Sequence, residues 1–181
     1  MSELTLTHWQ ELVHNALGDT ALSIECLNGA VVVMVDPEDI RHAALQLRDN
    51  PNTRLDILSH MTAVDYSPRD PRFEVVYELF SLQFKQRARV KCALPFDGGE
   101  YDKPQIDSIH DIYLTANWHE RECADLFGIA FAGHPDPRRI LLPDDWDGHP
   151  LRKEYPFDGK RAWKLGSSVA NAGTMESDLG L

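Results

Sequence analysis

Proline is concentrated in one stretch of this chain. Five of the eleven prolines lie within residues 133–158. Because proline lacks a backbone N–H and disfavours a helical conformation in the residue before it, this stretch can form neither a self-sufficient helix nor a central strand. The sequence therefore predicts a folded domain over residues 1–132, an extended arm over residues 133–165, and a flexible tail over residues 166–181 that is rich in Gly, Ser, Ala and Asn.

The N-terminal part of the predicted domain carries signals for a helix followed by a hairpin. Thr7 is placed to cap a helix that ends at Gly18. The dipeptide Asn28-Gly29 is favoured in two-residue hairpin turns, so it predicts paired strands over Leu22–Leu27 and Ala30–Val35. The second strand is β-branched at most positions, which is typical of a central strand.

The middle of the chain continues with helix and strand signals. Asp36-Pro37 predicts the start of a second helix. The patterns that follow predict three strands, a short fourth strand and a third helix, over Leu55–Tyr66, Phe73–Phe84, Arg87–Leu94, Ile106–Leu114 and Trp118–Phe127. Asn117 is the expected cap of the third helix and Gly128 its expected end. This order predicts an α+β fold: a two-layer α/β domain with a mixed sheet, helices on one face, and an extended proline-rich C-terminal arm.

Charge and hydropathy exclude several classes of protein. Acidic residues outnumber basic ones by 29 to 18, and the resulting net charge of −11 repels nucleic-acid phosphates. The longest uncharged apolar stretch, Cys26–Val35, has about half the length that a membrane-spanning helix needs. The N-terminus contains Glu3 and lacks the basic and apolar regions of a signal peptide. We therefore expect a soluble cytoplasmic protein that binds no nucleic acid and does not itself span a membrane.

The sequence shows no ligand pattern for a common cofactor. The three cysteines, Cys26, Cys92 and Cys123, are far apart and form no CxxC pair, which argues against an iron–sulfur cluster of ordinary spacing. Glycine-rich nucleotide motifs and the GxSxG motif of serine hydrolases are also missing. We therefore predict no catalytic, cofactor-binding or metal-binding residue in this chain.

The third predicted helix is nevertheless dense in charge. Glu122 and Asp125 share roughly one face with Trp118, and this pair of carboxylates is one candidate for acid–base catalysis. A helix stabilised by ion pairs is the simpler interpretation, because structural charge networks are common. On that interpretation, Arg121 pairs with Asp125 or Glu122.

A metal site is a further alternative for this helix. His119 and Cys123 are four residues apart, a spacing that places two ligands on one helix face, and His134 and His149 are available to complete the set. The last two are far apart in the proline-rich arm, unlike the close ligand pairs of zinc sites. Cys123 is more simply a small apolar residue of the packing face. An independent metal-dependent enzyme is thus the less favoured functional hypothesis.

Four basic residues alternate with other residues just after the predicted strand Phe73–Phe84. If Lys85, Arg87, Arg89 and Lys91 lie on one strand, they project from the same face. One interpretation is a basic stripe that faces an acidic partner. The other is a solvated edge strand that its charges protect from aggregation.

The arm is basic within an acidic chain, since residues 138–164 hold seven basic and five acidic side chains. Arginine and aromatic residues dominate the energetics of protein interfaces. The side chains expected to dock on a partner protein are Arg138, Arg139, Trp146, Arg152, Lys153 and Tyr155. The alternative is a belt over the chain's own sheet, packed through Ile140, Leu141 and Leu142.

Several short motifs within residues 118–156 match one family. They are Glu120-Arg121-Glu122, Asp125-Leu126-Phe127-Gly128, His134-Pro135, Arg138-Arg139-Ile140-Leu141 and the block from Gly148 to Pro156. On these residues the chain resembles the C subunit family of respiratory NADH–quinone oxidoreductase (complex I), in its separate form rather than the form fused to the D subunit. Pro137 and Glu154 are small departures from the family's pattern.

The resemblance implies an accessory subunit in the hydrophilic arm of a proton-pumping NADH–quinone oxidoreductase. Such a subunit carries no flavin, iron–sulfur cluster or quinone site, and it supports assembly of the quinone-reducing module and electron transfer from NADH to quinone. Its expected partners are homologues of the D, B and I subunits, with NADH and quinone reached only through the complex. Its expected location is peripheral, on the cytoplasmic face of the inner membrane. Related ferredoxin- or F420-linked complexes and membrane-bound hydrogenases are the alternative assemblies.

Overall fold

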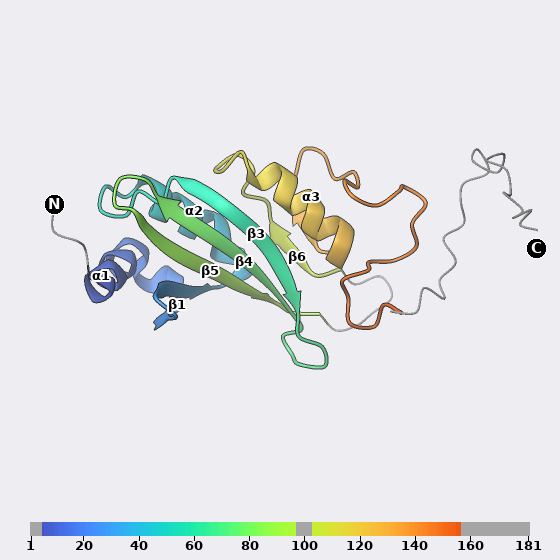
Figure 1. Cartoon of the computed structure of the whole chain (residues 1–181), viewed down its shortest axis with the longest axis horizontal. Coiled ribbons are helices and arrows are strands. Elements are labelled where there is room, and N and C mark those ends of the chain that lie inside the picture. The colour runs from blue at the N-terminus through green and yellow to red at the C-terminus, as the bar shows by residue number, and fades with distance from the viewer. Residues whose placement is uncertain (1–4, 97–102, 157–181) are drawn as a thin grey trace, which may run out of the picture.

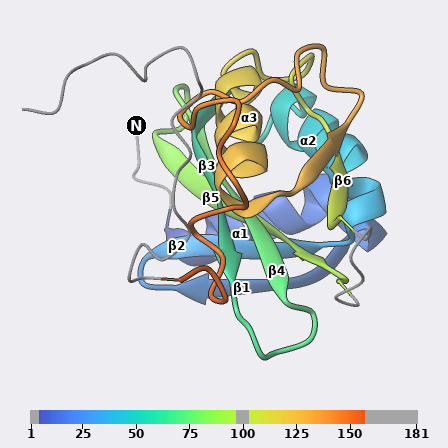
Figure 2. The same ribbon diagram turned by 90° about the vertical axis from the view of Figure 1, so that its right-hand side faces the viewer.

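The structure is a sheet with helices on one face and an arm at one end (Figures 1 and 2). The computed structural model describes residues 5–96 and 103–156. Its helices are α1 (Leu6–Leu17), α2 (Ile40–Asp49) and α3 (Ala116–Phe127), with short 3₁₀ turns at Gly18–Thr20 and Pro37–Asp39. Its strands are β1 (Ala21–Leu27), β2 (Ala30–Val35), β3 (Ile57–Asp65), β4 (Phe73–Ser81), β5 (Gln86–Leu94), β6 (Gln105–Asp107) and β7 (Ala130–Ala132).

The main sheet has five strands in the order β1-β2-β5-β4-β3. Neighbouring strands are antiparallel except β2 and β5, which run parallel. The sheet is therefore mixed, and the β-branched strand β2 lies inside it, as the sequence predicted. The expected two-layer α+β fold is confirmed. No helix of the described residues is long and apolar enough to cross a membrane.

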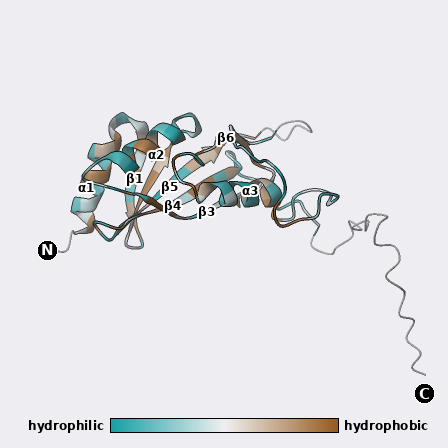
Figure 3. Ribbon diagram, turned by 90° about the horizontal axis from the view of Figure 1, so that it is seen from above, coloured by the Kyte–Doolittle hydropathy of each residue, from teal (hydrophilic) through white to brown (hydrophobic). Residues whose placement is uncertain are grey.

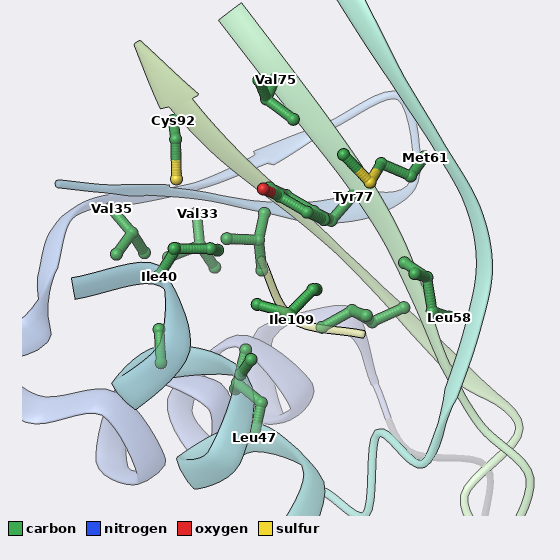
Figure 4. Close-up of a cluster of buried hydrophobic side chains, with 14 of the residues drawn as sticks. Val33, Val35, Ile40, Leu47, Leu58, Met61, Val75, Tyr77, Cys92 and Ile109 are labelled. Atoms are coloured by element: carbon green, nitrogen blue, oxygen red, sulfur yellow. The ribbon is translucent and has the colours of Figure 1, made fainter. Parts of the chain in front are cut away.

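The hydrophobic core lies between the sheet and the helices (Figure 4). Along β4 every second side chain is buried, and Tyr77 in its middle is 1% exposed. Trp9 and Val13 of α1 and Ile40 and Leu47 of α2 complete this core from the helix side. Apolar and polar residues alternate around α1 and α2 accordingly (Figure 3). The apolar residues that recur with period two in the strands and with helical period in α1 and α2 are thus the residues that are buried.

Two of the four cations of the predicted basic stripe lie beside carboxylates of the neighbouring strand. Lys91 Nζ is 2.7 Å from Glu74 Oε1, and Arg89 pairs with Glu78, both glutamates belonging to β4. Strand β5 is central, so the edge-strand interpretation is wrong. Lys85 precedes β5 with a positive φ of 53° and is not part of the strand. Cross-strand ion pairs account for the charges of Arg89 and Lys91 on β5.

Two predicted helix caps are wrong by a few residues. Helix α1 begins one residue before Thr7, and its cap is Thr5, whose Oγ accepts from the N–H of His8 at 3.4 Å. Helix α3 begins at Ala116, so Asn117 lies inside it. The N–H of Ala116 already donates to the carbonyl of Tyr113, because a preceding turn runs into the helix. Such a start needs no side-chain cap.

The strand predicted over Ile106–Leu114 is much shorter. Only Gln105–Asp107 is extended, as β6, and it pairs in parallel with β7, which the sequence did not predict. After β6 the chain turns, with the N–H of Tyr113 donating to the carbonyl of Ile109 at 2.9 Å. The buried Tyr113 hydroxyl donates to the carbonyl of Leu55 at 2.7 Å. A tertiary hydrogen bond thus fixes the turn where the apolar pattern predicted a strand.

Candidate functional site

The residues that match the family motif gather where α3 meets the arm. The arm leaves β7, passes along α3 and returns to the end of β3 and the start of β4 (Figures 1 and 2). Helix α3 contributes two buried carboxylates to this junction, Glu120 at 0% exposure and Asp125 at 3%. Buried carboxylates are rare unless they are paired or hydrogen-bonded, so their partners show how the junction is built.

Asp125 is the point at which the arm is anchored. Its Oδ2 accepts three successive backbone N–H groups, those of Ile140, Leu141 and Leu142, at 3.1, 2.9 and 2.9 Å. Its Oδ1 is 2.8 Å from a guanidinium nitrogen of Arg139. Burial alone raises the pKa of Asp125, but the three N–H donors and Arg139 outweigh it and hold that pKa below its usual value. Successive N–H groups around one carboxylate form an anion nest, made here by the arm.

Arg121 does not pair with Asp125 or Glu122, and that prediction is wrong. Its guanidinium donates to the carbonyls of Arg138 and Arg139, both at 2.9 Å, and lies 3.5 Å from Asp136. Arg121 therefore binds the backbone of the arm. Asp125 is occupied by the arm, and among the described residues Glu122 has no hydrogen bond or ion pair, so the structure does not support an acid–base carboxylate pair.

The last turn of α3 is capped by the arm. A helix ends with backbone carbonyls that lack partners inside the helix. Here His149 Nδ1 donates to the carbonyl of Asp125 at 2.8 Å, the N–H of Leu151 to that of Leu126 at 3.1 Å, and Arg152 Nε to that of Phe127 at 2.6 Å. The positive charge of Arg152 also complements the negative end of the helix dipole.

The tripeptide Gly-His-Pro occurs twice in the arm, at residues 133–135 and 148–150. The two histidines bind opposite ends of the same helix, α3. His134 Nε2 donates to the carbonyl of Asn117 at 3.0 Å, near the start of α3, whereas His149 binds near its end. His134 Nδ1 accepts the N–H of Asp136 at 3.0 Å, so its ring also fixes the start of the arm. Burial lowers the pKa of His149, which favours the neutral form of that ring.

Glu120 ties the segment after β6 to the helix. Its carboxylate accepts the N–H of Ile109 at 2.8 Å and the hydroxyl of Ser108, and it lies 3.8 Å from His134 Nε2. Burial raises the pKa of Glu120 above its ordinary value. The sequence predicted Glu120 as a family-motif residue but not Ser108, because the two residues are joined only through the fold.

A second anchor holds the far end of the arm. Arg72 binds Asp65 through two parallel hydrogen bonds of 2.9 and 2.7 Å, and the N–H of Lys153 donates to the same carboxylate at 2.8 Å. The guanidinium of Arg152 lies 5.3 Å from the ring centre of Phe73, within the range of cation–π contacts. Local spacing does not reveal this anchor, because Asp65 and Arg72 meet across a turn between two strands and Lys153 lies 88 positions after Asp65.

This second anchor predicts a pH-dependent stability. Burial raises the pKa of Asp65, but Arg72 and the N–H groups of Lys153 and Ser67 outweigh it and lower it to about 2. A carboxylate whose pKa falls from about 4 to about 2 on folding contributes about 2.5 kcal/mol to the free energy of unfolding at neutral pH. That contribution is present above pH ~4 and is lost as the pH falls towards ~2.

We therefore expect Asp65→Asn to lower the free energy of unfolding at pH 7 by at least about 2 kcal/mol. The difference from wild type should shrink as the pH falls from about 4 to about 2. Urea unfolding across this pH range measures it, with Asp49→Asn as the control, since Asp49 is exposed and its one ion pair among the described residues is with its neighbour Arg48. A constant difference at all pH values would contradict the role assigned to Asp65.

The four metal-ligand candidates are not brought together. Cys123 is 2% exposed within the core, and burial raises the pKa of its thiol. His119 packs edge-to-face against His60, while His134 and His149 bind opposite ends of α3. Residues 5–96 and 103–156 contain no group of three His, Cys, Asp or Glu that could hold a metal ion. The geometry gives the metal-dependent enzyme no support.

The structure places the six predicted docking residues differently. Arg139 and Arg152 bind α3, and the backbone N–H of Lys153 binds Asp65, so these contacts hold the arm on α3 and at the end of β3. The Arg138 side chain, by contrast, is 80% exposed, and that of Lys153 is also exposed. Trp146 and Tyr155 are half-buried. The described arm is therefore a belt that leaves Arg138 and Lys153 on its outer side; the tail over residues 166–181 lies outside the described residues.

Comparisons with known proteins agree with the motif. The family model described as "Respiratory-chain NADH dehydrogenase, 30 Kd subunit" matches residues 33–161. The C subunit of NADH-quinone oxidoreductase from Geotalea uraniireducens (strain Rf4) is 46% identical over 138 residues, which cover 76% of this chain and 80% of that protein. The C subunit from Roseiflexus sp. (strain RS-1) is 44% identical over 147 residues, covering 81% of this chain and 82% of that protein.

Two solved structures share the fold. The trypsin-resistant fragment (1-134) of Nqo5 matches with a TM-score of 0.55 and 29% identity, covering 70% of this chain and 96% of the fragment. A chain of the membrane-bound sulfane sulfur reductase, described as an archaeal respiratory membrane complex, matches with a TM-score of 0.69 and 23% identity over 94% of this chain and 98% of that chain. On the strength of the family match and the close relatives, this chain belongs to the 30 kDa subunit family of respiratory-chain NADH dehydrogenase, the family of the C subunit of NADH-quinone oxidoreductase.

Proposed function

We propose that this chain is an accessory subunit of the peripheral arm of a proton-pumping NADH–quinone oxidoreductase. Its role is to support assembly of the quinone-reducing module, and thereby electron transfer from NADH to quinone, without a catalytic site or cofactor of its own. The observation that carries the proposal is the use of the motif residues. The hydrogen bonds of these motif side chains, those of Glu120, Arg121 and Asp125, bind backbone groups of the chain's own arm and loops. Such residues stabilise a fold, as expected of a scaffold subunit.

The proposed partners are the homologues of the D, B and I subunits, and the proposed location is peripheral, on the cytoplasmic face of the inner membrane. NADH and quinone are reached only through the complex. A rigid arm supports docking because a segment that is already ordered loses little conformational entropy when it binds. Arg138 and Lys153, which remain exposed on the belt, are the arm side chains proposed to reach a partner.

A related membrane complex is the second candidate, because the sulfane sulfur reductase chain has the same fold. That likeness is at 23% identity and concerns the fold alone. The relatives named as C subunits of NADH-quinone oxidoreductase are 44% and 46% identical. The NADH-linked complex is therefore the first choice over a ferredoxin- or F420-linked complex or a membrane-bound hydrogenase.

Deletion of the gene for this chain tests the proposal. We expect membranes of the deletion strain to lose NADH–quinone reductase activity, and a tagged copy of the chain to restore it. The tagged chain should co-purify with the homologue of the D subunit, and the isolated chain should show no visible absorbance and no oxidation of NADH. Full NADH–quinone reductase activity without the chain, or a chromophore that stays with the isolated chain, would contradict the proposal.

A further inference from the structure

A cavity lies between α3, β7 and the first part of the arm. It encloses about 340 Å³, and its wall includes Phe131 of β7 and Ala124 of α3. Four basic side chains also line it, namely Lys103, Arg121, Arg138 and Arg139. Two carboxylates line it as well, those of Glu120 and Asp125.

The carboxylates of the cavity are already committed to groups of the chain. Arg139 neutralises Asp125, and Glu120 accepts hydrogen bonds from Ser108 and Ile109. Two arginines remain at the mouth, and they share one carboxylate. Arg138 binds Asp136 through bonds of 2.7 and 2.8 Å, while Arg121 lies 3.5 Å from the same side chain.

The cavity lining carries four basic side chains against the two carboxylates of Glu120 and Asp125, on a protein that is acidic overall. Arg121 and Arg138 share the nearby Asp136, and Asp144 also acts electrostatically on Arg138. The Lys103 side chain is exposed and has no ion pair with any described residue. The chain as a whole has a net charge of −11. A local field of the opposite sign attracts acidic groups and orients them as they approach.

An apolar rim continues from this mouth along the outer face of α3. Residues 118, 121 and 125 lie on one helix face by their spacing. The arm covers that face at Asp125 and Arg121 but leaves Trp118 62% exposed, with Leu114 83% exposed just before the helix. The Arg121 guanidinium lies 5.6 Å from the Trp118 ring centre, so the aromatic ring and the charged mouth are contiguous. Exposed tryptophan beside arginine is the composition of an interface hot spot.

We propose that this surface docks an acidic segment of a partner polypeptide in the respiratory complex. A Glu or Asp side chain of the partner enters the mouth between Lys103 and Arg138, and an apolar side chain beside it packs on Trp118 and Leu114. The inference rests on the proposed function and names the chemistry by which the subunit is recognised. Arginine pairs well with carboxylates because its planar N–H groups match both oxygens, which favours an acidic side chain as the occupant.

Membranes from a strain that lacks this chain provide the test. The full chain, purified and fluorescently labelled, is titrated onto these membranes at several salt concentrations. The doubly reversed variant Lys103→Glu with Arg138→Glu should bind at least about tenfold more weakly than wild type, with the larger effect at low salt. The matched control, Lys85→Glu with Arg87→Glu, reverses two exposed charges near the start of β5 and should bind like wild type.

Trp118→Ala separates the two parts of the proposed contact. It should also weaken binding by roughly tenfold, but with little change in salt dependence, because the lost contact is apolar. Its circular dichroism and thermal midpoint should stay near wild type, since Trp118 is mostly exposed. If wild type fails to bind the depleted membranes, the proposed function falls and this inference with it. If wild type binds and both the charge-reversed and Trp118→Ala variants bind equally well, this inference alone is overturned.

Discussion

Replacing Asp125 by alanine is expected to release the arm from α3. The change leaves Arg139 and the N–H groups of Ile140, Leu141 and Leu142 without their shared acceptor. Removing one partner of a buried ion pair costs about 3–5 kcal/mol. The arm can move into water, so we expect the lower end, a loss of about 3 kcal/mol in the free energy of unfolding.

Hydrogen exchange and urea unfolding together measure this effect. The amides of residues 140–142 should lose their protection, while those of the central strand β5 keep theirs, because the core does not depend on Asp125. Asp111→Ala is the control, since Asp111 pairs with Arg41 in a more exposed position and should cost at most about 1 kcal/mol. Unchanged protection of residues 140–142 in the Asp125→Ala variant would show that the nest does not hold the arm.

Replacing Gly128 by alanine is expected to have the second large effect. Gly128 ends α3 with φ +72°, a conformation that costs an L-residue about 1–2 kcal/mol. A Cβ atom placed there would lie 2.5 Å from two ring atoms of His149 and 2.7 Å from Arg152 Nη2. Both side chains cap carbonyls of the last turn, so moving them breaks the capping hydrogen bonds. We expect a total loss of roughly 3 kcal/mol in the free energy of unfolding.

Gly133→Ala is the matched control for this prediction. Gly133 has a similar φ of +79°, but a Cβ atom there would have no atom within 4 Å. Gly133→Ala should therefore lower the free energy of unfolding only by the cost of the left-handed conformation, about 1–2 kcal/mol. The difference between the two variants in urea unfolding isolates the close approach of the arm to Gly128. Equal losses would mean that His149 and Arg152 adjust without breaking their bonds to α3.

Much of the fold was readable from local patterns. The hairpin at Asn28-Gly29 and the helix end at Gly128 were predicted because a turn or a left-handed residue depends on a few neighbouring side chains. The central position of β2 followed from its β-branched residues. The caps at Thr7 and Asn117 were wrong because several residues near each helix start satisfy the same local preference, and packing selected among them.

The residues of the candidate site could be predicted from the sequence motif, but their contacts could not. The charged residues of α3 were identified, yet Arg121 was assigned to carboxylates of its own helix, because spacing along a helix is the only contact that a sequence shows directly. In the structure Arg121 and Asp125 both bind the arm instead. The buried link from Glu120 to Ser108 and the pairing of β6 with β7 were likewise invisible.

The sequence by itself determined the order of the three helices and of strands β1–β6, the mixed α+β class, the absence of regular structure from the proline-rich stretch that follows β7 and, through its motif, the family. These depend on properties that act over a few residues, such as proline's missing N–H, side-chain periodicity and turn preferences. Only the tertiary structure decided what the arm does. Its contacts join Asp125 to residues 140–142 and Asp65 to Lys153, which stand 88 positions apart. Such contacts form because a helix end and a buried carboxylate must find hydrogen-bond partners wherever the chain brings them, and local sequence does not specify that place.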